Sequence, residues 1–175
     1  LDDADAVMLS AETAIGAHPV ESVRTAARIA AETERRGAAF IASSCLGNPK
    51  DLAEAVARAA AEVAAADSEI AAIACFTESG RTAELLSRAR PRVPIAAFCA
   101  QPPVARRLAL YRAVHPFIAE AMPDTDAVIG MLDGGLQSDL GVAPGTQVVL
   151  VAASPVGQAS TNLLKLHRVG EWPSG

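Results

Sequence analysis

The stretch Thr-Glu-Ser-Gly-Arg-Thr at positions 77–82 gathers side chains that could hold an anion. It follows an apolar run, and its backbone N–H groups stand at the expected start of a helix, unpaired and at the positive end of the helix dipole. Gly80 lets the backbone approach a ligand, and Arg81 adds a planar cationic fork. Neighbouring hydroxyls are further donors. The pattern predicts a phosphate site made by Thr77, Ser79, Gly80, Arg81 and Thr82.

The same residues allow a simpler interpretation, in which Thr77 or Ser79 only caps the helix. The residue types alone do not decide between a cap and a phosphate site. Glu78 counts against an anion, because a carboxylate close to a phosphate would repel it unless the side chain points outward.

From residue 70 onward, apolar runs alternate with helix-forming segments. A continuous apolar run is typical of a strand covered on both faces, and strands that alternate with helices form a mostly parallel sheet. Pro116 and the charges of the last strand indicate sheet edges. We therefore expect an α/β fold, a mostly parallel five-stranded sheet sandwiched by helices. The expected strands are 70–76, 93–100, 113–120, 146–154 and 161–169, and the expected helices are 51–66, 80–90, 102–112 and 124–141.

The first thirty-odd residues carry a separate strand–loop–helix unit. Residues 4–10 have the pattern of a short buried strand, and Pro19 suits the first turn of the helix that follows. A lone parallel strand has no sheet to join, so its partner strands either precede Leu1, as we expect, or lie in the second domain. Asn48 or Asp51 would cap the next helix. The predicted organisation is this unit at 1–36, a connector at 37–50, a complete α/β domain at 51–170 and a tail at 171–175.

The composition excludes several classes of protein. The net charge is -5, without a basic block, which argues against nucleic acid or an anionic membrane as a partner. No apolar run reaches the roughly 18 residues that a membrane span requires. Three cysteines lie far apart, which favours reduced thiols in a cytoplasmic protein. These are Cys45, Cys75 and Cys99.

The remaining charged residues predict surface roles. No His or Cys cluster has the spacing of a metal site, and Asp124 and Asp126 suit the start of a helix. The arginines near Tyr111 are expected on a solvated helix face, and the charges of the last strand at an edge or interface. These two groups are Arg106, Arg107 and Arg112, and Lys165, His167 and Arg168.

Several long motifs resemble one family. "DADAVMLSAETAIGAHPVESVRTAARIAAETE" resembles the end of the catalytic barrel of pyruvate kinases. "FTESGRTAELLSRARPRVPIAAF", "ARRLALYRAVHPFIAE" and "PGTQVVLVAASPVGQASTNLLKLHRVG" resemble the C-terminal domain of that family, in the same order along the chain. The resemblance covers essentially residues 2–170. It implies that residues 1–36 are the last strand–helix unit of an incomplete TIM barrel.

The resemblance implies a parent enzyme that transfers a phosphoryl group from phosphoenolpyruvate to ADP in the last step of glycolysis, with Mg²⁺ and K⁺. The metal ligands, the essential lysine and the nucleotide lid would precede Leu1, so the chain alone should be inactive. A homotetramer is also implied, and the arginines of the helix at 102–112 could meet a neighbouring subunit.

Two residues near the start are implied to border the substrate pocket, namely Ser10 and Glu12. The alternative for Ser10 is a cap on the helix that follows it. Asp3 and Ala11 stand where the family has glycine. A methyl group at Ala11 beside Ser10 raises the question of a degenerate copy.

The resemblance also implies that residues 77–82 hold a phosphate of an allosteric sugar phosphate. The opposite wall would be the loop 153–164, which has no Arg or Trp between Ser154 and Asn162 to bind a second phosphate. We therefore expect a sugar monophosphate or a nucleoside monophosphate as effector. The alternative to an enzyme fragment is a free-standing regulatory module that binds phosphorylated ligands, and the gene sequence upstream of Leu1 would distinguish them.

Overall fold

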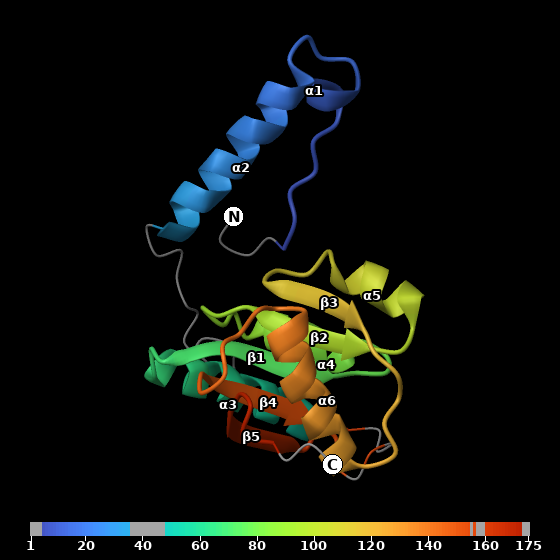
Figure 1. Cartoon of the computed structure of the whole chain (residues 1–175). Helices are drawn as coiled ribbons and strands as arrows, with labels where there is room; N and C mark the ends of the chain where they lie inside the picture. Colours follow the sequence, from blue (N-terminus) through green and yellow to red (C-terminus); the bar gives the residue numbers. More distant parts are fainter. Residues whose placement is uncertain (1–4, 36–47, 155, 157–159, 173–175) are drawn as a thin grey trace. The chain divides into compact units, whose positions relative to one another are not determined.

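The computed structural model describes residues 5–35, 48–154, 156 and 160–172. The chain divides into two compact units, residues 1–40 and 41–175 (Figure 1). The predicted connector at 37–50 and Cys45 lie almost wholly outside the described residues, as does part of the loop 153–164.

The first unit consists of a short helix, α1 (Ala11–Ala14), and a long one, α2 (Pro19–Arg35). Pro19 opens α2, as predicted, since a proline needs no hydrogen bond in the first turn. The apolar side chains of α2 remain exposed, with Val20, Val23 and Ile29 each more than half accessible. The amphipathic pattern of this helix therefore has no covering partner within the described residues.

The predicted buried strand at 4–10 is wrong for the residues that the structure describes. Residues 5–10 form no strand, and Val7 and Met8 are 58% and 89% exposed. A strand is stable only when a neighbouring strand takes up its backbone hydrogen bonds. An apolar pattern without such a neighbour leaves the segment irregular.

The second unit contains the predicted α/β sheet. The order of its strands is β3-β2-β1-β4-β5, all parallel except β5, which runs antiparallel to β4. Pro116 lies in the edge strand β3, as predicted, where a missing N–H costs least. The strands are β1 (Ile70–Phe76), β2 (Ile95–Cys99), β3 (Val114–Ile118), β4 (Gln147–Ala152) and β5 (Leu163–Arg168).

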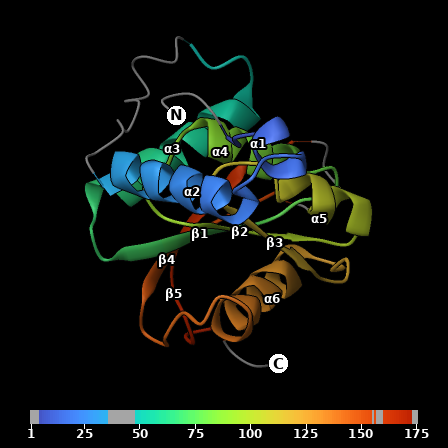
Figure 2. The same ribbon diagram turned by 90° about the horizontal axis from the view of Figure 1, so that it is seen from above.

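Helices cover both faces of this sheet, as Figure 2 shows from above. One face packs against α3 (Leu52–Ala66), α4 (Arg81–Arg88) and α5 (Pro102–Leu108), and the other against α6 (Thr125–Ser138). The two apolar layers explain why β1, β2 and β4 are apolar at nearly every position.

Two aspartates cap helices as the sequence predicts. Asp51 accepts a hydrogen bond from the Glu54 N–H at 2.9 Å, and Asp124 accepts one from the Ala127 N–H at 2.8 Å. Of the two candidates for α3, Asp51 is thus the cap. α5 is shorter than expected and ends at Leu108, so Tyr111 and the residues after it lie in the turn toward β3.

His167 lies in the edge strand β5, as the sequence suggested, but its side chain is not at the surface. Its ring is buried, and its Nε2 lies 2.6 Å from Oδ1 of Asp133 on α6. The Gly170 N–H donates to the same oxygen at 2.8 Å. This buried pair joins β5 to α6. Arg168 does lie exposed, and donates to the Gly145 carbonyl at 3.1 Å.

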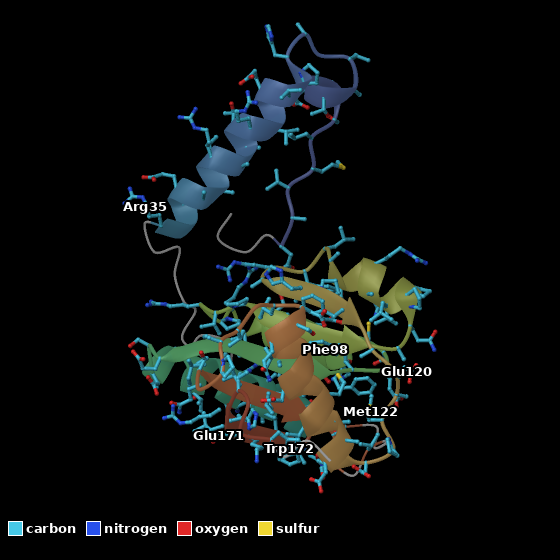
Figure 3. All side chains as sticks on the ribbon, viewed as in Figure 1. Arg35, Phe98, Glu120, Met122, Glu171 and Trp172 are labelled. Atoms are coloured by element: carbon cyan, nitrogen blue, oxygen red, sulfur yellow. The ribbon has the colours of Figure 1, made fainter. Side chains whose placement is uncertain are left out.

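Two adjacent glycines of α6 have opposite surroundings. A Cβ at Gly135 would overlap the ring of Phe98, whereas one at Gly134 would meet nothing within 4 Å. Phe98 lies in the layer that α6 covers (Figure 3). The helix is continuous through both glycines, and Gly135 allows it to approach the sheet closely.

This difference predicts opposite effects of one substitution. Gly135→Ala forces the helix away from Phe98 and should cost about 1–3 kcal/mol of unfolding free energy. Gly134→Ala is the matched control and should gain about 0.5–1 kcal/mol, because alanine is the better helix former. Urea unfolding of the two variants measures both values. Equal effects would contradict the close approach.

Candidate functional site

The candidate site lies where the chain leaves the sheet in two directions. From β1 the chain continues to its neighbour β2, but β4 lies on the other side of β1. The carboxyl ends of β1 and β4 are therefore adjacent, while the connections that follow them diverge. Open α/β sheets bind ligands at such a switch point.

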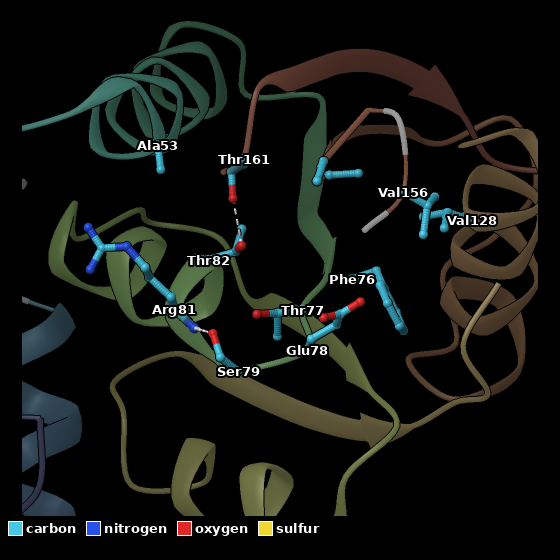
Figure 4. A pocket seen from close by; sticks show the side chains of 12 residues that line it. Ala53, Phe76, Thr77, Glu78, Ser79, Arg81, Thr82, Val128, Val156 and Thr161 are labelled. Atoms are coloured by element: carbon cyan, nitrogen blue, oxygen red, sulfur yellow. Dashed lines mark hydrogen bonds between the residues drawn. The ribbon is translucent and has the colours of Figure 1, made fainter. Parts of the chain in front are cut away.

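A cavity of about 280 Å³ occupies this position (Figure 4). Its walls come from the ends of β1 and β4 and from the first turns of α3, α4 and α6. The residues of the predicted junction that line it are Thr77, Glu78, Ser79, Arg81 and Thr82, and the others include Ala53, Phe76, Val128, Ala153, Val156 and Thr161. The structure thus brings four of the five predicted phosphate-site residues together around one cavity.

Gly80, the fifth predicted residue, shapes the junction from outside the cavity. It is the N-cap residue of α4 and has φ of 88°, a conformation that favours glycine. A Cβ there would lie 2.8 Å from Nη2 of Arg107. The N-cap residues of α3 and α6 accept a hydrogen bond with their side chains, whereas the N-cap residue of α4 does not.

The hydroxyls of the junction serve its local fold. Thr77 is buried, and its Oγ1 accepts a hydrogen bond from the Gly80 N–H at 3.0 Å. Oγ of Ser79 lies 3.5 Å from the Arg81 nitrogen, a long hydrogen bond. Thr77 therefore stabilises the turn that leads into α4, and it does not cap the first turn of the helix itself. A hydroxyl that accepts from the backbone can still donate its own proton to a ligand.

Thr82 meets a residue that the sequence analysis did not single out. Its hydroxyl lies 2.7 Å from the hydroxyl of Thr161, and both side chains are buried. This bond joins the first turn of α4 to the segment before β5. The only signal for Thr161 was its place in the loop expected to form the opposite wall.

Arg81 reaches the cavity wall but already has an anionic partner. Its Nη2 lies 2.6 Å from Oδ2 of Asp51, the cap of α3. In Figure 4 its guanidinium points away from Glu78. The hydrogen bond from the Glu54 N–H, together with Arg81, holds the pKa of Asp51 below its usual value.

Arg107 was predicted on a solvated helix face, and that prediction is incomplete. From α5 it donates a hydrogen bond to the carbonyl oxygen of Ser79. A second guanidinium therefore braces the junction between β1 and α4. Glu78, by contrast, lines the cavity, so it does not simply point away from a ligand.

Ser10 and Glu12 lie together in the first unit, both exposed. The Ser10 N–H donates to Oε2 of Glu12 at 3.0 Å, and hydrogen bonds from the N–H groups of Glu12 and Ser10 lower the pKa of Glu12. The hydroxyl of Ser10 makes no capping bond. Ser10 is therefore the N-cap residue of α1, but its side chain does not cap the helix, and the carboxylate of Glu12 accepts the hydrogen bond in this turn.

Other chemistry has little support in the described part of the chain. That part contains no group of three or more His, Cys, Asp or Glu side chains that could hold a metal ion. Among the described residues, no helix is long and apolar enough to cross a membrane. Cys75 and Cys99 are free and buried, as expected, and burial raises the pKa of the Cys75 thiol to about 12.

Comparisons with known proteins match the chain and its fold to one family. The family model "Pyruvate kinase, alpha/beta domain" matches residues 54–167. The pyruvate kinase of Mycobacterium tuberculosis is 36% identical over 172 residues, covering 98% of this chain and 36% of that protein. The pyruvate kinase of Clostridium acetobutylicum is 38% identical over 172 residues, covering 96% of this chain and 36% of that protein.

A solved structure shows the same fold. The crystal structure of a pyruvate kinase from Cryptosporidium parvum superposes with a TM-score of 0.74 at 30% sequence identity. The match covers 93% of this chain and 32% of that chain. The chain thus spans about a third of the length of the relatives that it matches.

The hydroxyl pair at the cavity gives a stability prediction. Thr82→Val leaves the Thr161 hydroxyl buried without its partner and should cost about 1–3 kcal/mol of unfolding free energy. The double variant Thr82→Val/Thr161→Val should cost less than the sum of the two single variants, because neither hydroxyl remains. Urea unfolding tests this, and strictly additive costs would rule out the bond.

Proposed function

Because this chain belongs to the pyruvate kinase family and matches its C-terminal part, we propose that it is part of an enzyme that transfers a phosphoryl group from phosphoenolpyruvate to ADP, giving pyruvate and ATP. In such transfers catalysis consists mostly of positioning and charge stabilisation. The exposed Ser10 and Glu12 would contribute at most an edge of the substrate pocket. The reaction would take place in the cytoplasm, as the last step of glycolysis.

The metal ions of this reaction would be held elsewhere. The family implies Mg²⁺ and K⁺, but the described residues offer no cluster of three or more His, Cys, Asp or Glu that fits such an ion. We therefore derive no step through either ion. The ligands would belong to the two thirds of the relatives' length that this chain does not match.

The role of this chain would be regulation and assembly. The observation that carries the proposal is the cavity at the switch point, where Ser79, Arg81 and Thr82 surround the N-terminus of α4. A helix N-terminus with hydroxyls and an arginine favours a phosphate. The enzyme would assemble as a homotetramer, with neither nucleic acid nor a membrane as partner.

The rest of the cavity favours a ligand with a single phosphate. Arg81 is the only cationic side chain among the described residues that line it. The far side carries the apolar Val128 and Val156, and Glu78 adds a negative charge. A second phosphate would find no cation there, whereas the body of a sugar or nucleoside monophosphate could pack against this wall.

A free-standing regulatory module remains the second candidate. The division of the chain favours it, because residues 41–175 form a compact unit with a sheet and two apolar layers of their own. Such a module would bind the same phosphorylated ligands without catalysing a reaction. The gene sequence upstream of Leu1 decides between the two: a continuing barrel sequence supports the enzyme, and a start codon supports the module.

The proposed role predicts that the chain alone has no catalytic activity. The 175-residue chain should form no pyruvate above a protein-free control when it is given phosphoenolpyruvate, ADP, Mg²⁺ and K⁺, since the ion ligands lie outside it. A coupled lactate dehydrogenase assay measures this, with an intact pyruvate kinase as positive control. Turnover by the chain alone would contradict the assignment of its role.

The second prediction concerns the ligand. At equal concentration, glucose 6-phosphate or AMP should raise the thermal midpoint of the chain more than fructose 1,6-bisphosphate does. Binding to the native state alone stabilises it by about 2.7 kcal/mol at a hundredfold excess over Kd. Arg81→Met should abolish the shift, while Arg106→Met, the matched control on the neighbouring helix, should retain it. A larger shift with the bisphosphate would overturn the proposed ligand class.

A further inference from the structure

Asp51 makes two contacts with its two carboxylate oxygens. Oδ1 accepts from the Glu54 N–H at 2.9 Å and caps α3, while Oδ2 lies 2.6 Å from Nη2 of Arg81. The second contact joins the first turns of two helices that are distant in sequence. Capping needs only an oxygen acceptor, but the contact with Arg81 also needs the negative charge.

The partner of Asp51 is the side chain on which phosphate binding depends. Arg81 is the sole cation among the described residues that line the cavity, and it opens α4. The carboxylate of Asp51 binds the guanidinium of Arg81 through a charge-assisted hydrogen bond, which is also the interaction that a phosphate oxygen would make with it. Two anions cannot both take the same donor of this guanidinium.

The ion pair between Arg81 and Asp51 is also weak enough for a phosphate to replace the carboxylate. The side chains of Arg81 and Asp51 are 57% and 43% exposed, and ion pairs this accessible to water and salt add little stability. A phosphate at the N-terminus of α4 would gain both the guanidinium and the free N–H groups of the helix. The carboxylate of Asp51 lies at the start of α3, so it interacts with the guanidinium but not with the N–H groups of α4.

Resting on the proposed phosphate site, we propose that Asp51 is an internal competitor of the ligand, so that binding must break the contact between Asp51 and Arg81. The apparent affinity is then reduced by the fraction of molecules in which Arg81 is held by Asp51. Asp51 thereby sets the ligand concentration at which the site fills. Because Asp51 is also the cap of α3, its release by the ligand leaves a carboxylate without its arginine partner at the start of that helix.

The neighbouring contacts show where this change is felt. The Lys50 N–H donates to Oε2 of Glu54 at 3.0 Å, and Glu54 also pairs with Arg58. The start of α3 is therefore a short chain of hydrogen bonds to carboxylates that begins at the Lys50 N–H and includes Asp51. In the sequence, these residues directly follow the segment that leads from the first unit to the second.

The test uses Asp51→Asn, which removes the charge and keeps the cap, since asparagine caps helices as well as aspartate does. Isothermal titration of the 175-residue chain with glucose 6-phosphate, and with inorganic phosphate, should give a Kd roughly threefold to fivefold lower than for the unsubstituted chain. In the Arg81→Met background, which should not bind the probe, the same substitution should restore no binding, because both the site and the competition need Arg81.

Asp67→Asn is the matched control. Asp67 ends α3, and its Oδ1 accepts from the Glu69 N–H at 2.9 Å, so the substitution makes the same chemical change roughly 22 Å away along the helix. Its Kd should equal that of the unsubstituted chain. Asp51→Ser, another good cap without the charge, provides a second variant if asparagine perturbs folding.

The possible outcomes separate the competition from the site itself. If the unsubstituted chain binds glucose 6-phosphate and Asp51→Asn binds it no more tightly than Asp67→Asn does, Asp51 is no competitor, although the proposed site stands. If neither the unsubstituted chain nor Asp51→Asn binds either probe at millimolar concentration, the phosphate site falls, and the competition falls with it.

Discussion

The direction of the helices relative to the parallel strands is the constraint from which the site follows. A helix that links two parallel strands runs back against them, so its N-terminus lies near the carboxyl edge of the sheet. In this chain the first turns of α3, α4 and α6 all reach that edge and line one cavity. Aspartates cap α3 and α6, while α4 begins at Gly80 without a side-chain cap. The N-cap residue of α4 thus differs from those of α3 and α6 in having no side chain that could accept a hydrogen bond from the first turn.

The local sequence pattern was sufficient to predict the elements whose surroundings are the same on both faces. The strands β1, β2 and β4 are covered on both faces, so continuous apolar runs identified them. Asp51 and Asp124 were interpreted correctly because a cap depends on neighbours in the sequence, and Pro116 because proline itself is restricted to edge strands. The strand predicted at 4–10 is wrong for the opposite reason. A strand depends on a partner strand, and a local sequence pattern does not show whether one is present.

The site was predicted only in part, because a local sequence pattern does not show contacts between distant parts of the chain. The segment 77–82 was found because its residues are consecutive. The contacts that modify it come from elsewhere: Asp51 is 30 residues away from Arg81, and Thr161 is 79 residues away from Thr82. Arg107 and His167 were assigned to surfaces because single charged residues usually lie there. Only the tertiary packing of α5 and α6 gives them partners.

Trp172 has a consequence for how this molecule can be observed. It is the only tryptophan of the chain, and its ring lies against Gly130 of α6, under the ammonium group of Lys165 and edge-on to the ring of His167. Its fluorescence emission is thus an intrinsic optical signal from the seam between β5 and α6. Quenching of this emission on unfolding would therefore report separation of the two elements.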